Sequence, residues 1–173
     1  MPLHPTVAGF LRYLHDHPNV RSQIKAAPDK TLLYAGRFGM AMWKQIQLDK
    51  RLNPQIRDKQ TLNEVLGTIA APQAPYPTLL KYVEAIDADP KVPPGDKTIC
   101  WRALSGIFAA QATGAVSFQI GSEVNGQKVF VATELKVLAR NPKVDSLTRE
   151  LIEYYQKCAQ NKQEAMNVGF IAG

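Results

Sequence analysis

The sequence has few cysteines and no long hydrophobic run, and both shortages limit the classes of protein to which it can belong. Cys100 and Cys158 are too few for a disulfide framework, so we expect a reducing compartment, the cytoplasm. Secretion by a route that uses no signal peptide would leave the same pattern. No stretch of about 20 apolar residues occurs, and the first residues lack a basic segment followed by an apolar one, so we expect neither a transmembrane segment nor a signal peptide.

Acidic residues are scarce in the first third of the chain. Residues 1–60 contain ten lysines and arginines but four acidic residues, a net charge of +6, whereas residues 61–173 contain eleven of each. The net charge of the whole chain, +6, therefore belongs to this basic N-terminal third. Apolar residues make up 45% of the sequence, which is typical of a globular protein and too many for a disordered one. We expect residues 1–173 to form one domain, with proline-rich connectors near 71–77 and 89–94.

Apolar residues recur at spacings of three and four in several short segments, which is the pattern of amphipathic helices. Thr6 can cap a first helix that ends at Pro18, and Thr61–Glu64 is a capping box that opens another. The last helix begins at Asp145 or Ser146. The pattern predicts six or seven short helices in all. The inward face of the last one is formed by Leu147, Leu151, Tyr154 and Cys158.

A β-hairpin is the clearest local prediction. Apolar and polar side chains alternate over 116–120, as in a half-buried strand. Asn125-Gly126 is a strong turn signal, because a type I′ turn needs positive φ at both central positions. With a return strand over Gln127–Leu135, we expect an antiparallel hairpin at about 115–135, to which Thr31–Ala35 or Gly169–Ala172 could add a third strand. The predicted fold class is therefore α+β, a mainly helical single domain packed around one hairpin.

The segment Asp29–Leu52 has two interpretations. As one helix, it would align basic residues that recur every seven positions into a single ridge. As a strand over 31–35, a turn at 36–39 and then a helix, it would lose the first half of that ridge. Gly36 and Gly39 favour the second interpretation, because glycine is costly inside helices, and we keep both open. The predicted binding residues are Lys30, Arg37, Lys44 and Arg51, continued by Arg57.

Two other patterns could support catalysis. Cys100-Trp101 falls in the first turn of a helix that Asp96 or Thr98 would cap, where the helix dipole lowers a thiol pKa. A thiol enzyme also needs a histidine downstream, and all three histidines lie in the first 17 residues. Some nucleotide-using transferases pair an arginine early in the chain with a late glutamate, as Arg37 and Glu134 would do here. Otherwise Glu134 is a solvent-facing strand end.

The leading functional hypothesis is a non-catalytic interaction protein of adaptor or effector type. It would bind an acidic partner, most simply another protein, through the basic N-terminal surface. A nucleic acid could use the same ridge, and the remaining alternatives are a small transferase or thiol enzyme, or charges that simply face water. No glycine-rich phosphate-binding motif occurs, and His4, His15 and His17 have no cysteine placed to complete a zinc site. We therefore expect no cofactor and no metal, and the oligomeric state is left open.

Overall fold

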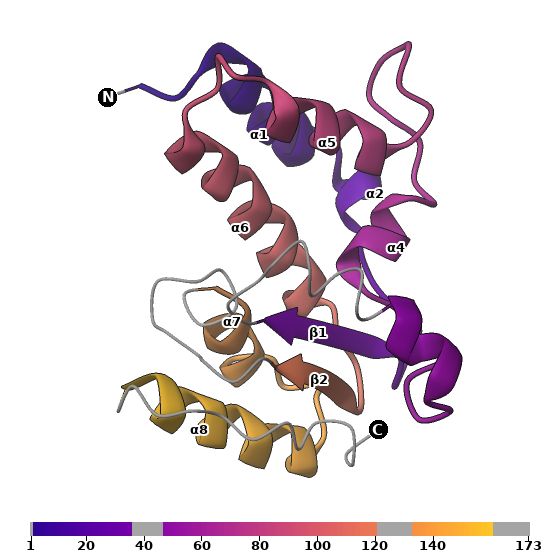
Figure 1. Cartoon of the computed structure of the whole chain (residues 1–173). Helices are drawn as coiled ribbons and strands as arrows, with labels where there is room; N and C mark the ends of the chain where they lie inside the picture. Colours follow the sequence, from indigo (N-terminus) through magenta and orange to yellow (C-terminus); the bar gives the residue numbers. More distant parts are fainter. Residues whose placement is uncertain (1, 36–46, 121–132, 161–173) are drawn as a thin grey trace.

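The computed structural model describes residues 2–35, 47–120 and 133–160 (Figure 1). Its helices are α1 (Pro5–Asp16), α2 (Pro18–Arg21), α4 (Leu62–Leu66), α5 (Leu79–Ala88), α6 (Pro94–Ala110), α7 (Leu135–Ala139) and α8 (Ser146–Gln160). Its strands are β1 (Thr31–Ala35) and β2 (Val116–Ile120). Residues 47–52 form a further short helix. The described part of the chain is thus mainly helical and contains one small sheet.

Helix α6, with 17 residues, is the central element. In Figure 1 it runs from the group of α1 and α5 at the top to α7 and the sheet below, and it contacts α1, α4, α5 and α7. One hydrophobic cluster of buried side chains extends from Val7 in α1 to Cys158 in α8.

The two strands pair in parallel, with Leu33 opposite Phe118 and Leu32 opposite Ser117. Residues opposite each other lie on the same face, so one face carries Leu33 and Phe118. The Phe118 ring packs on Tyr155 of α8, with 5.2 Å between centroids. Leu32 and Ser117, on the other face, are also fully buried. Both faces are therefore covered, as is usual for parallel strands.

The predicted antiparallel hairpin at about 115–135 is wrong. β2 pairs in parallel with β1, and residues 133–139 are helical where the return strand was expected to end. A parallel pair needs a long crossover connection, which the intervening chain supplies through α4, α5 and α6. The alternation over 116–120 identified a real strand, but its partner lies far away in the sequence. Asn125-Gly126 and Gly169–Ala172 lie outside the described residues.

The two interpretations of Asp29–Leu52 are decided at their first residues. Thr31–Ala35 is a strand, so a single helix over the whole segment is wrong and the strand alternative is confirmed for these residues. Leu32 is fully buried and Leu33 is only 2% exposed in the strand that pairs with β2. This burial stabilises the strand more than the helix-type spacing of apolar residues would stabilise a helix. The expected turn at 36–39 lies outside the described residues, and helix is present at 47–52.

The predicted N-terminal helices form, with one change of cap. The Thr61–Glu64 capping box is confirmed: Thr61 Oγ1 accepts from the Glu64 amide at 3.3 Å, and Glu64 Oε1 accepts from the Thr61 amide at 3.3 Å. Helix α1 begins earlier than expected, because Pro5 occupies its first position and His4 Nδ1 accepts from the Thr6 amide at 3.2 Å. Its buried residues are Val7, Phe10 and Leu14, as the spacing predicts.

The later helices differ in start or in inward face. Helix α6 begins at Pro94 rather than at Asp96 or Thr98, since proline fits the first turn of a helix. Helix α8 begins at Ser146 as expected, but Leu147 is 46% exposed. Thr148 turns inward instead, where its Oγ1 accepts from the Val116 amide at 3.0 Å. The buried face of α8 consists of Thr148, Leu151, Ile152, Tyr155 and Cys158.

Candidate functional site

The predicted binding residues have different surroundings. Arg51 and Arg57 are exposed. Lys30 is partly buried, and its ammonium group pairs with the carboxylate of Asp58. The hydrogen bond from Lys30 lowers the pKa of Asp58 below its ordinary value. Arg37 and Lys44 lie outside the described residues.

These residues do not lie along one continuous helical ridge. Lys30 precedes strand β1, whereas Arg51 belongs to the helix at 47–52 and Arg57 to the loop after it. A spacing of seven residues aligns side chains only along an unbroken helix. The strand therefore removes Lys30 from any ridge that Arg51 could form.

Two other lysines of the basic third stabilise the fold. Lys50 Nζ donates to the two carboxylate oxygens of Glu64 at 2.8 and 2.7 Å, and to the Lys59 carbonyl oxygen at 2.6 Å. Lys59 is itself only 7% exposed, and its Nζ donates to the Asp29 carbonyl oxygen at 2.8 Å. These bonds join the helix at 47–52, the start of α4 and the residues before β1. Lys59 therefore does not add to the exposed positive charge of residues 1–60.

The exposed arginines adjoin an exposed apolar surface. Leu48 and Leu52 are 48% and 72% exposed, and they share a face because they lie four residues apart on one helix. Arg57 Nη2 donates to the Arg51 carbonyl oxygen at 3.2 Å, which places its guanidinium at the end of that helix. Within the described ranges, neither arginine forms an ion pair with a carboxylate. We call Leu48, Arg51, Leu52 and Arg57 the 48–57 patch.

The helix that carries this patch is tied to the sheet. Gln119 Nε2, on β2, donates to Asp49 Oδ2 at 3.2 Å. The Asn53 amide donates to the Asp49 carbonyl oxygen at 2.7 Å, where the helix ends. The patch is therefore presented on an anchored element, with Leu48 and Leu52 left exposed.

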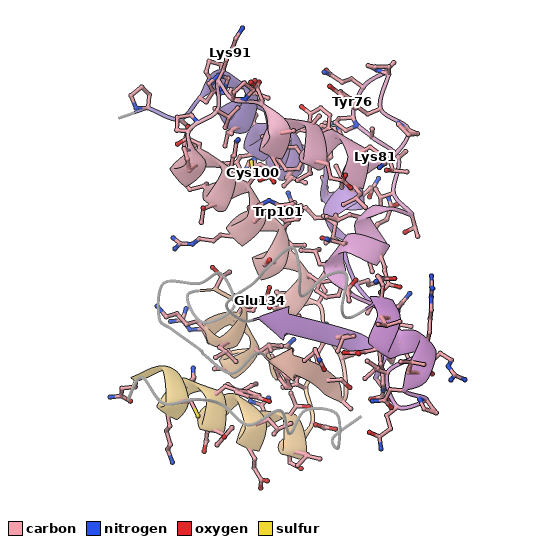
Figure 2. The ribbon with its side chains drawn as sticks, in the orientation of Figure 1. Tyr76, Lys81, Lys91, Cys100, Trp101 and Glu134 are labelled. Atoms are coloured by element: carbon pink, nitrogen blue, oxygen red, sulfur yellow. The ribbon has the colours of Figure 1, made fainter. Side chains whose placement is uncertain are left out.

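Cys100 does not have the surroundings of a catalytic thiol. It is the seventh residue of α6, beyond the first turn, and is 1% exposed. Burial, together with the nearby carboxylates of Asp96 and Asp87, raises the pKa of the Cys100 thiol to about 11. Figure 2 labels it on α6 beside Trp101, whose Nε1 donates to Asp87 Oδ1 at 3.3 Å. This geometry is typical of an inert, buried thiol.

Glu134 was expected at a solvent-facing strand end, and this is wrong. It is 9% exposed and lies at the start of α7 (Figure 2). Burial raises the pKa of its carboxyl to about 7, and a hydrogen bond with Ser105 of α6 offsets part of the shift. Glu134 Oε2 has no hydrogen-bond partner in the described chain. The transferase hypothesis also requires Arg37 in the same pocket, and Arg37 lies outside the described residues.

The histidines act locally in the N-terminal helices. His4 caps α1, His15 Nδ1 lies 3.1 Å from Asp16 Oδ1, and His17 Nδ1 lies 2.7 Å from the Tyr13 carbonyl oxygen. Nowhere among residues 2–35, 47–120 and 133–160 do three metal-binding side chains come together.

Comparisons with known proteins add no assignment. No protein-family model, curated protein or solved structure matches this chain. None of the helices in the described ranges is long and apolar enough to cross a bilayer.

Proposed function

We propose that this protein binds an acidic protein partner through the 48–57 patch. The observation that carries the proposal is the exposure of Leu48 and Leu52 on one helical face beside Arg51 and Arg57, whose guanidinium groups form no ion pair with a carboxylate of the described residues. A partner segment with acidic and apolar side chains matches both chemistries. The protein would act as a non-catalytic adaptor or effector.

The apolar half of the patch favours a protein partner over a nucleic acid. Fully burying one leucine side chain contributes about 1.5–3 kcal/mol, and a phosphate backbone offers no apolar surface for it to cover. Arginine forms bidentate hydrogen bonds with carboxylates, which adds orientation to charge attraction. Leu48 and Leu52 would therefore supply affinity, and Arg51 and Arg57 the preference for acidic partners.

Three other cations of the basic third take part in contacts within the fold. The charges of Lys30 and Lys50 are offset by Asp58 and Glu64, and Lys59 is buried. These groups are used within the fold and are less available to a partner. Arg37 and Lys44 belong to the same proposed binding set by their place in the sequence.

We place this interaction in the cytoplasm as part of the same proposal. Cys100 and Cys158 are both free and buried. Reduced thiols suit a compartment kept reducing by the cell.

The proposal is tested by charge reversal in the patch. The variant Arg51→Glu/Arg57→Glu and the single variant Leu52→Ser are compared with the control Lys91→Glu/Lys136→Glu, which reverses two exposed cations elsewhere. The probe is a fluorescent synthetic helical peptide with leucines four residues apart, flanked by glutamates. We expect the reversal to weaken peptide binding at least tenfold, about 1.4 kcal/mol, and Leu52→Ser to weaken it too, with the control unchanged.

A second probe, a 20-base-pair DNA duplex, separates the alternatives. If the duplex binds more tightly than the peptide, with a steep loss in salt and no effect of Leu52→Ser, the patch is a nucleic-acid interface and the proposal fails. Peptide binding that survives Arg51→Glu/Arg57→Glu would show that the patch is only a solvated surface. Circular dichroism of each variant checks that the fold is retained.

A further inference from the structure

A cavity of about 380 Å³ shares no lining residue with the 48–57 patch and is lined entirely by described residues. Its walls come from the loop after α2, from Gln60, from the C-terminal end of α6 and from the loop between α7 and α8. Ligand cavities in proteins begin at about 300 Å³, so this one is large enough for a small organic molecule.

Hydrogen bonds join the cavity walls to one another. Gln60 Oε1 accepts from the Ala27 amide at 2.8 Å. Gln111 Nε2, after α6, donates to the Arg21 and Ile24 carbonyl oxygens at 2.7 and 2.8 Å. The Thr113 carbonyl oxygen accepts from the Asp29 amide at 2.9 Å. These bonds hold the wall segments together without a ligand, which lowers the entropic cost of binding.

Lys25, Lys143 and Gln60 bring donor groups to the wall. Lys25 and Lys143 are exposed, and neither forms an ion pair within the described chain. Gln60 uses its oxygen to hold Ala27, which leaves its amide nitrogen available. The neighbouring carboxylate of Asp29 is partly engaged, because its Oδ1 accepts from the Ala115 amide at 2.7 Å. Two ammonium groups and an amide are a donor set for a carboxylate or a phosphate.

The remaining wall is apolar. Ala26, Ala27 and Pro28 line it with aliphatic carbon. A bare anion would leave this surface uncovered. An anion that carries a hydrocarbon body would cover it, and removing this apolar surface from water would strengthen binding. We propose that the cavity between Lys25 and Lys143 binds a small organic anion, a compact apolar body bearing one carboxylate or phosphate group.

The probes are phenyl phosphate and benzoate, with inorganic phosphate and benzyl alcohol as the charge-only and apolar-only comparisons. Binding is followed by the shifts of backbone amide NMR signals from Ala27 and Thr113. We expect phenyl phosphate or benzoate to bind more tightly than either comparison. Lys25→Ala/Lys143→Ala should weaken this binding at least tenfold, whereas Lys91→Ala/Lys136→Ala should leave it unchanged.

Three results would overturn the proposal. The first is that neither phenyl phosphate nor benzoate shows saturable binding below about 10 mM, which would mean very weak affinity. The second is that benzyl alcohol binds as tightly as these two anions. The third is that the Lys25→Ala/Lys143→Ala variant binds them as tightly as the parent protein. Whichever of phenyl phosphate and benzoate binds more tightly identifies the anionic group. The Arg51→Glu/Arg57→Glu variant should retain this binding, so the cavity and the 48–57 patch can fail separately.

Discussion

At the scale of single residues, Glu134 shows how burial changes the chemistry of a side chain. A carboxylate loses its hydration when buried, and one hydrogen bond to Ser105 replaces little of it. The protonated form is therefore favoured, and the pKa of the Glu134 carboxyl rises to about 7 from an ordinary value of 4.5. Between these two values the folded state binds more protons than the unfolded state. This group accordingly makes stability fall as pH rises through that range, with the full loss present above about pH 7.

We predict that Glu134→Gln removes this pH dependence, because glutamine stays neutral. Relative to the parent protein, the variant should gain about 3 kcal/mol in free energy of unfolding between pH 4.5 and pH 8. Urea unfolding at several pH values measures the difference. Glu150→Gln, which changes an exposed carboxyl on α8, is the control. If the difference in free energy of unfolding between Glu134→Gln and the parent stays constant with pH, Glu134 has the same pKa in the folded and unfolded states, and the prediction is wrong.

At the scale of single elements, the short helix α4 depends on its first residues. It has five residues, too few to be stable by itself. Its capping box satisfies backbone donors at its start, and Lys50 holds the same Glu64 carboxylate. Helix α5 has a simpler cap: Thr78 Oγ1 accepts from the Lys81 amide at 3.2 Å. The two helices therefore allow a comparison between a supported cap and an isolated one.

Thr61→Ala should cost more stability than Thr78→Ala. A lost cap costs about 1 kcal/mol, and at Thr61 the partly buried Glu64 carboxylate also loses the hydroxyl that lies 3.0 Å away. We expect about 2 kcal/mol for Thr61→Ala and about 1 kcal/mol or less for Thr78→Ala. Urea midpoints at pH 7 measure both. Equal losses would mean that Lys50 and Glu64 keep α4 in place without the threonine.

At the scale of the whole molecule, Asn141 connects the central helix to the C-terminal part of the fold. Its Nδ2 donates to the carbonyl oxygens of Ala109, Ala110 and Ala112, at 3.0, 3.3 and 2.9 Å. Its own carbonyl oxygen accepts from Arg149 Nη2 of α8 at 2.7 Å. The buried side-chain amide of Asn141 thus donates to the last carbonyl groups of α6, and its backbone carbonyl joins the chain between α7 and α8 to α8.

Asn141→Ala should destabilise the fold by about 2–3 kcal/mol, because buried carbonyl groups would lose their donor. Asn53→Ala is the control, since the Asn53 side chain accepts only from the Gln55 amide at 2.9 Å, at an exposed site. Urea unfolding measures the loss. Hydrogen exchange should also become faster at residues 109–115 in the Asn141 variant. A loss no larger than that of the control would show that water replaces the asparagine amide.

Local rules determined much of the fold from the sequence itself. The capping box of α4, the buried stripe of α1 and the start of α8 were predicted, because each depends on residues within a few positions of one another. The charge excess of residues 1–60 follows from composition alone. These features need no information about distant partners.

Only the tertiary structure decided which segments meet. β2 pairs in parallel with β1, which lies far away in the sequence, and this pairing places Leu33 opposite Phe118 in the core. The same long-range packing buries Glu134 and pairs Lys30 and Lys50 with Asp58 and Glu64, while Arg51 and Arg57 stay exposed. A count of charges along a sequence contains no distances. The basic third was therefore visible in the sequence, but the fold selected which of its cations are available to a partner.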